Sequence, residues 1–73
     1  MAKSKSKGPK PRYNRIKEVL EEKQKSQTWL AEKLDVDFQT VTRYVNNHRQ
    51  PTIARLFDIA KVLNVNVSSL LIQ

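Results

Sequence analysis

Two long polar side chains, Gln39 and Arg43, lie four residues apart along the chain. A glutamine amide can bond bidentately to adenine, and an arginine guanidinium can pair with O6 and N7 of guanine. Phe38 and the methyl group of Thr42 could contact thymine methyl groups, which carry sequence information without a hydrogen bond. These four residues are therefore candidates for reading the bases of double-stranded DNA. Two alternatives stay open, since Phe38 could pack against Val36 or Trp29 and Arg43 could be an ordinary solvated cation.

The segment that holds these residues is free of acidic side chains. No aspartate or glutamate occurs between Asp37 and Asp58, an interval of 20 residues. It contains three arginines and the single histidine of the chain, which are Arg43, His48, Arg49 and Arg55. Such a segment can approach phosphate without repulsion.

Other polar residues of this segment are candidates for contacts with the DNA backbone, which fix register rather than read sequence. They are Thr40, Asn46, Asn47, His48 and Arg49. Asn47 and His48 could instead be turn residues, because the stretch 46–51 has no apolar side chain other than its final proline.

The spacing of apolar residues predicts that the base readers lie on a helix. Val41, Tyr44 and Val45 follow the i, i+3, i+4 pattern after Asp37, a suitable N-cap, and predict a helix to about Asn46. With these apolar residues turned inward, the outer face carries Phe38, Gln39, Thr42, Arg43 and Asn46.

The same reasoning predicts the elements that must hold this helix in place. Helices are expected over about 14–23, from Ser26 to about Asp35, and from a Thr52 cap onward, with a short final helix after Asn66. The helix after Thr52 has the strongest apolar stripe, made of Ile53, Leu56, Phe57, Ala60 and Leu63. No segment alternates as a strand does, so we expect an all-α, compact bundle of four to five helices.

Charge and composition bound the function. The 73 residues carry a formal charge of +7, of which residues 1–12 hold five basic side chains and no acid. We expect 1–12 to be a disordered basic arm, either contacting DNA or merely solubilising, and 13–73 to be the folded domain.

With no cysteine, one loop histidine and no glycine-rich loop, the sequence favours no enzyme, metal site, cofactor or small-molecule ligand. It has no apolar stretch for a membrane span, so a cytoplasmic protein, nucleoid-associated when bound to DNA, is expected.

Taken in order, these elements resemble the Cro/CI (Xre-type, lambda repressor-like) helix-turn-helix family. The resemblance rests on the run from Gln27 to Val36 and on the downstream pattern Val41, Tyr44, Asn46, Pro51, Thr52, Leu56, Ile59, Ala60, Leu63 and Val65. It implies a bundle of about five helices with a helix-turn-helix, in which 27–34 is the second helix and 38–46 is the recognition helix.

The resemblance also implies functional roles. Gln27 occupies the position where members of the family contact a backbone phosphate, and a helix N-terminus favours phosphate. The alternative is that Gln27 is an ordinary residue of the first helical turn. Asp35 stands where the family usually has glycine, and an aspartate tolerates the left-handed conformation at modest cost. Members of the family mostly bind operator DNA, often as two-fold dimers, and the apolar Leu71 and Ile72 offer this chain a surface for a homodimer.

Two hypotheses follow. The first is a sequence-specific transcriptional regulator, most simply a repressor, that reads the major groove with helix 38–46. The second is the same fold used as a protein- or RNA-interaction module, such as a bridging factor or an antitoxin-like protein, which would depend on apolar surface elsewhere.

Overall fold

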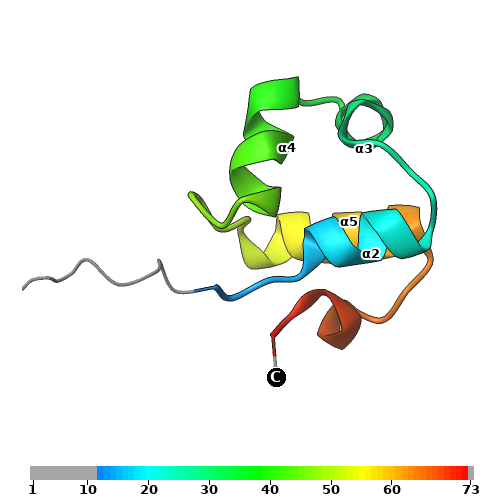
Figure 1. The fold of residues 1–73 in the computed structure, drawn as a ribbon, viewed down its shortest axis with the longest axis vertical. Coiled ribbons are helices and arrows are strands. Elements are labelled where there is room, and N and C mark those ends of the chain that lie inside the picture. Colours follow the sequence, from blue (N-terminus) through cyan, green and yellow to red (C-terminus); the bar gives the residue numbers. More distant parts are fainter. Residues whose placement is uncertain (1–11, 73) are drawn as a thin grey trace, which may run out of the picture.

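The computed structural model describes residues 12–72 and contains four α-helices and one 3-10 helix (Figure 1). The elements are α2 (Ile16–Glu22), α3 (Gln27–Leu34), α4 (Phe38–Val45), α5 (Ile53–Leu63) and the 3-10 helix η1 (Val67–Leu70). Within residues 12–72 the one β-type pairing is an isolated antiparallel bridge between Asn14 and Leu71. The expected all-α class is therefore confirmed. The basic arm lies outside the described residues except for Arg12.

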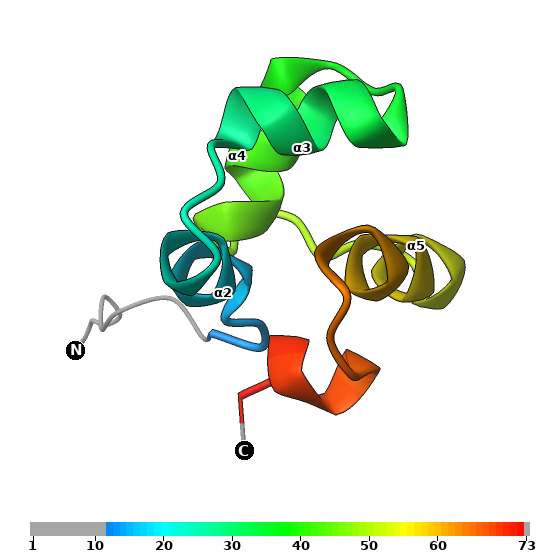
Figure 2. The ribbon, with the colours of Figure 1, turned by 90° about the vertical axis from the view of Figure 1, so that its right-hand side faces the viewer.

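The helices form a small bundle around one core (Figure 2). The helix α3 packs against α4 and α5, α2 packs against α4, and η1 contacts both α2 and α5. None of these helices has the length and apolar character needed to cross a bilayer.

Side-chain caps begin two of the helices where the sequence predicts them. The Ser26 hydroxyl accepts a hydrogen bond from the Trp29 N–H (2.9 Å), and the Thr52 hydroxyl accepts one from the Arg55 N–H (3.1 Å). Asp37 is the N-cap residue of α4, but its side chain makes no capping hydrogen bond. The N-terminus of α4 therefore keeps backbone N–H groups that no cap side chain covers.

The turn between α3 and α4 depends on a left-handed residue. Asp35 ends α3 with φ 58° and ψ 48°, and the next amide, Val36 N–H, donates to Ala31 O at 3.0 Å. This is the reversal that allows α4 to start with only three residues between it and α3. Aspartate thus adopts the conformation for which glycine is the usual residue, as the sequence predicts.

The core contains the predicted apolar residues of α4, and those of α5 except on one edge. Ile59, Leu56 and Leu63 are buried, whereas Ile53 and Phe57 keep 74% and 58% of their surface exposed. The prediction that Ile53 and Phe57 belong to the core stripe is therefore wrong. At 100° per residue these two side chains lie side by side on the edge of the buried sector, where no neighbouring helix covers them.

A buried pair of amides joins the start of the chain to the end of α4. The Asn47 side-chain oxygen accepts from the backbone N–H of Tyr13 (2.9 Å) and Asn14 (3.1 Å), and its NH₂ group donates to Asn14 O (3.1 Å). The Asn14 NH₂ group in turn donates to Tyr44 O (3.0 Å) and to the Gln50 side-chain oxygen (2.8 Å). Asn14 and Asn47 are 1% and 8% exposed, so these bonds replace water that the groups have lost. Because Asn14 is used in this way, α2 begins at Ile16 and not at about residue 14.

The carboxyl end of the chain completes this junction. The Arg15 N–H donates to Leu70 O (2.8 Å), and the Ile72 N–H donates to Tyr13 O (2.9 Å). Residues 13–15 are therefore held between the loop after α4 and the segment after η1.

We predict that Asn47→Ala destabilises the fold far more than Asn64→Ala. Both asparagines have left-handed backbones, with φ 58° and 59°, so alanine pays a similar conformational cost of about 1 kcal/mol at each position. Only Asn47→Ala also removes the acceptor of two backbone N–H groups, which should cost about 2–3 kcal/mol more. Urea unfolding of the two variants measures the difference, and equal losses would mean that the amide pair contributes nothing beyond its backbone conformation.

Candidate nucleic-acid interface

The helices α3 and α4 pack against each other and are linked by a side-chain hydrogen bond. The Thr42 hydroxyl, in the middle of α4, donates to the side-chain oxygen of Gln27, the first residue of α3, at 2.9 Å. This bond occupies the oxygen of the Gln27 side-chain amide. The NH₂ group of the same amide remains available to donate a hydrogen bond. Gln27 is thereby oriented at a helix N-terminus, the place where backbone N–H groups and the helix dipole favour an anion.

The outer face of α4 carries the predicted base readers. Gln39, Arg43 and Asn46 are exposed, and Phe38 keeps 52% of its surface accessible. The opposite face is buried through Val41, Tyr44 and Val45. Since so much of Phe38 is exposed, its alternative placement in the core finds no support.

Thr42 lies on this face, but less of its side chain is available for contact with DNA than the sequence suggests. It is half-buried, and its hydroxyl is already donated to Gln27. Its methyl group is thus the part that remains for an apolar contact, which is the role assigned to it. Thr40 is also half-buried and lies beside these residues on α4.

The loop after α4 folds back onto the end of the helix. The backbone N–H groups of His48 and Arg49 both point at Arg43 O, at 2.9 Å and 3.2 Å. The side chains of His48 and Arg49 are exposed, so they extend the polar surface of α4 beyond its last turn.

Asn47 is the exception among the predicted phosphate ligands. Its side chain is 8% exposed, and both of its polar atoms are used within the molecule. The structure thus contradicts a phosphate contact by this side chain and agrees with the alternative, a turn residue. The sequence holds one cue to this role, which is that asparagine is among the few residues that tolerate a positive φ.

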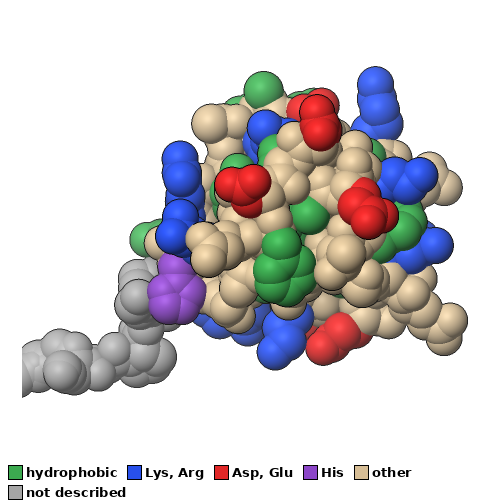
Figure 3. Space-filling view, turned by 90° about the horizontal axis from the view of Figure 1, so that it is seen from above, with side chains coloured by type: hydrophobic (Ala, Val, Ile, Leu, Met, Phe, Trp, Pro, Cys, Tyr) green, Lys and Arg blue, Asp and Glu red, His purple; other side chains and the backbone are tan. Residues whose placement is uncertain are grey.

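Charge on this end of the molecule is unevenly distributed. Figure 3 looks onto the end formed by α3 and α4 and shows acidic side chains within the face, with basic side chains toward its edges, some beside the histidine. Asp35 and Asp37, in the turn before α4, are exposed. The turn before α4 is therefore acidic, whereas the acid-free interval, from α4 into the following loop, adds the exposed Arg43 and Arg49 without an acidic side chain.

Arg55, the third arginine of the acid-free interval, has a structural partner. Its guanidinium donates to Leu34 O, near the carboxyl end of α3, at 3.4 Å. A cation at this position complements the negative end of the helix dipole. Arg43 and Arg49 are therefore the exposed arginines of the interval, while Arg55 helps to attach α5 to α3.

Sequence reasoning did not single out the lysines beside Trp29. The Nζ atoms of Lys25 and Lys33 lie 4.9 Å and 5.9 Å from the centre of the Trp29 ring, within cation–π range. Their i, i+4, i+8 spacing on and before α3 is the signal that could have revealed the cluster. Trp29 itself is half-buried and packs against the core, so part of its ring is covered by other side chains.

Comparisons with known proteins agree with this geometry. A family model described as helix-turn-helix matches residues 16–70, which span α2 to η1. A crystal structure from Bacteroides fragilis, described as that of "a putative DNA-binding protein", is 41% identical, covers 81% of this chain and 95% of its own, and superposes with a TM-score of 0.80. No curated protein matches the chain. The family match covers most of the chain, and the chain therefore belongs to the Cro/CI-like helix-turn-helix family.

Proposed function

We propose that this protein is a sequence-specific regulator of transcription that binds double-stranded DNA, with α4 in the major groove. The observation that carries the proposal is the exposure of Gln39 and Arg43 on one face of α4, while its other face is fixed in the core. Base reading requires long donors and acceptors on a helix that cannot rotate, and α4 meets both requirements. The DNA-binding description of the Bacteroides fragilis neighbour supports the same class of partner.

The base-reading set is Phe38, Gln39, Thr42 and Arg43. Gln39 would present its amide to adenine and Arg43 its guanidinium to guanine, one turn further along the helix. Phe38 and the Thr42 methyl group would contact thymine methyl groups. Phe38 is a large apolar side chain that is half exposed at the start of α4, and a methyl contact would cover it.

Backbone contacts would come from both ends of the helix pair. Gln27 would donate its NH₂ group to a phosphate, with its acceptor oxygen already held by Thr42. Thr40, Asn46, His48 and Arg49 would make further contacts along α4 and the loop that follows it. Such contacts fix the position of α4 in the groove without adding sequence preference.

The simplest regulatory role is repression by occupation of a promoter. A homodimer on an inverted repeat would place two copies of α4 about one turn of DNA, ~34 Å, apart. Within residues 12–72 there is no cluster of histidine, cysteine, aspartate or glutamate suited to a metal ion. The proposed role requires none, because DNA recognition uses contacts that the helix-turn-helix already supplies.

The basic arm would add nonspecific affinity for DNA. Arg12, its last residue, is paired with Glu18 (2.8 Å), and this bond holds the pKa of the Glu18 carboxyl below its usual value. The positive charge of Arg12 is thus partly balanced by Glu18 within the fold. The four remaining basic residues of the arm, Lys3, Lys5, Lys7 and Lys10, would supply the contacts with phosphate.

We predict that Arg43→Ala weakens binding to the preferred duplex by about 1–3 kcal/mol and relaxes the preference at one base position. Competition binding against duplexes altered at single positions measures both effects. Lys61→Ala is the matched control, because it removes one positive charge from an exposed position in the last turn of α5. If Arg43→Ala and Lys61→Ala have the same effect on base preference, Arg43 does not read DNA.

We predict that removal of residues 1–12 acts differently from Arg43→Ala. It should weaken binding to all duplexes and reduce the salt dependence of the affinity. Each lost phosphate contact lowers the slope of log K against log salt by about 0.9. A full-length variant with glutamine at positions 3, 5, 7 and 10 should reproduce the effect while keeping the Arg12–Glu18 pair. Unchanged affinity and slope in both variants would show that the arm does not contact DNA.

A further inference from the structure

The Asp37 carboxylate lies at the start of α4 and has no partner there. Asp37 is exposed and is the N-cap residue of α4, yet its side chain makes no capping hydrogen bond. No ion pair within residues 12–72 involves it. Both carboxylate oxygens can therefore accept hydrogen bonds from a donor outside the chain.

The backbone supplies a hydrogen bond that this side chain could have made. An N-cap side chain accepts from the second or third N–H group of its helix. In α4 the third of these groups, Thr40 N–H, donates to the backbone oxygen of Asp37 at 3.1 Å. The Ser26 and Thr52 hydroxyls, by contrast, both accept such a bond at the starts of α3 and α5. Asp37 thus has the residue type of a cap, but its side chain is free for another role.

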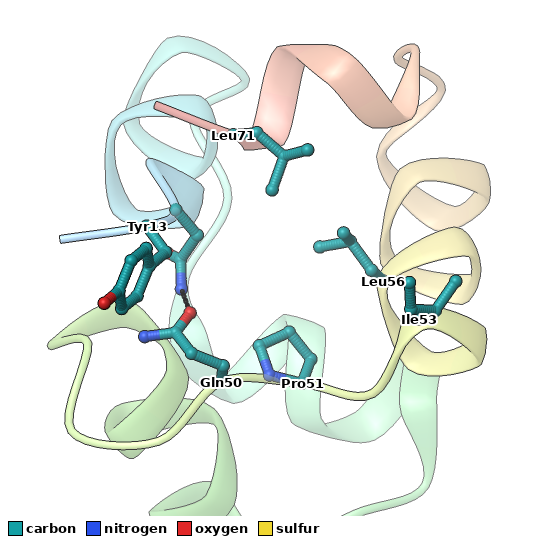
Figure 4. A pocket seen from close by; sticks show the side chains of 7 residues that line it. Tyr13, Gln50, Pro51, Ile53, Leu56 and Leu71 are labelled. Atoms are coloured by element: carbon teal, nitrogen blue, oxygen red, sulfur yellow. Dashed lines mark hydrogen bonds between the residues drawn. The ribbon is translucent and has the colours of Figure 1, made fainter. Parts of the chain in front are cut away.

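Asp37 and the buried junction lie at opposite ends of α4. At the carboxyl end, the Asn14 NH₂ group donates to Tyr44 O (3.0 Å) and to the Gln50 side-chain oxygen (2.8 Å). Figure 4 shows an apolar groove beside this junction, with a lining that includes Tyr13, Gln50, Ile53, Leu56 and Leu71. The carboxyl end of α4 is thus tied into the fold, whereas the amino end presents exposed side chains, those of Asp37, Phe38 and Gln39.

A carboxylate on this surface opposes binding to DNA in general. Asp37 immediately precedes the acid-free interval and stands two residues before Gln39, a proposed base reader. Because phosphate repels a carboxylate, Asp37 lowers the affinity for any duplex that offers it no hydrogen-bond donor. A group that penalises the wrong partners in this way increases specificity.

The chemistry of base edges indicates which donor Asp37 would meet. In the major groove guanine presents the acceptors N7 and O6, and thymine presents the acceptor O4, so neither base can donate to a carboxylate. Adenine and cytosine each present an amino group, but the adenine amino group has the acceptor N7 beside it. Since this acceptor repels a carboxylate, the N4 amino group of cytosine is the better partner.

We propose that Asp37 is a specificity-determining residue that accepts a hydrogen bond from the N4 amino group of a cytosine. The N-terminal residues of a helix in the major groove are those that contact base edges. Asp37 precedes Arg43 by six residues, which is about 9 Å along the helix axis, so the cytosine belongs to a different base pair from the guanine that Arg43 would contact. This inference rests on the proposed function, in which α4 lies in the major groove.

Competition binding against duplexes that carry each of the four bases at single positions tests this role. Asp37→Asn preserves the size of the side chain and removes its charge. Because the new amide can donate as well as accept, guanine and thymine become acceptable where cytosine was preferred. The preference for cytosine at one position should fall at least about fivefold, and the affinity for duplexes without that cytosine should rise.

Asp35→Asn is the matched control. It removes the same charge from an exposed position in the same turn, and asparagine tolerates the left-handed backbone there. It should change the affinity for all duplexes equally and leave the preference for cytosine within about twofold. Equal effects of Asp35→Asn and Asp37→Asn on base preference would overturn the inference.

Asp37→Ser separates base reading from helix capping. Serine is as good an N-cap residue as aspartate, so α4 should be retained while the preference for cytosine falls. Circular dichroism measures the helix content and the midpoint of thermal unfolding. A folded Asp37→Ser variant that keeps the full preference for cytosine would contradict the proposal, because it would show that Asp37 acts on the helix alone.

Failure of this inference and failure of the proposed function can be told apart. If Arg43→Ala alters base preference but Asp37→Asn does not, α4 reads DNA without Asp37 and the inference alone is refuted. If the unaltered chain prefers no sequence, the proposed function fails, and the role of Asp37 fails with it.

Discussion

The buried amides of Asn14 and Asn47 hold together the parts of this molecule that local sequence cannot position. Helix propensity and apolar spacing form each helix, but neither places the start of the chain against the end of α4. The two amides do so with bonds to backbone groups of Tyr13, Asn14 and Tyr44. In a domain of this size, with no disulfide, such a satisfied polar pair is a means of selecting one arrangement of helices. The end of α4, at Tyr44 O, and Gln50 in the loop after it are both bonded to this junction.

Most of the helical framework could be predicted from sequence because it depends on local physics. Ser26 and Thr52 cap helices as their side-chain chemistry suggests, and Asp35 takes the left-handed turn. The errors have a common origin in contacts between distant residues. Asn14 fits a helix start, and its side-chain oxygen does accept from the Ile16 N–H, but it also pairs with Leu71 and Asn47, which its neighbours in sequence do not predict. Ile53 and Phe57 fit an apolar stripe, yet their edge of α5 has no neighbour to cover it.

In the candidate site, too, some features follow from local sequence and others depend on contacts between distant residues. The exposed face of α4 follows from helical periodicity, so Gln39 and Arg43 could be placed before the fold was known. The bond from Thr42 to Gln27 could not, since it joins residues 15 positions apart on different helices. Asn47 differs from its neighbours Asn46 and His48 in its left-handed backbone and in its burial, and the burial depends on where the chain start returns. The apolar groove is likewise assembled from three separate segments.

In the proposed function, α4 would read bases, while Gln27 and the loop after α4 would hold phosphate. Its central claim is that α4 recognises a particular DNA sequence, and selection from a pool of random duplexes at physiological salt tests that claim most directly. The account predicts enrichment of an inverted repeat whose half-sites lie about one helical turn apart. If repeated rounds enrich no sequence, the exposed face of α4 does not read DNA, and the fold serves as an interaction module instead.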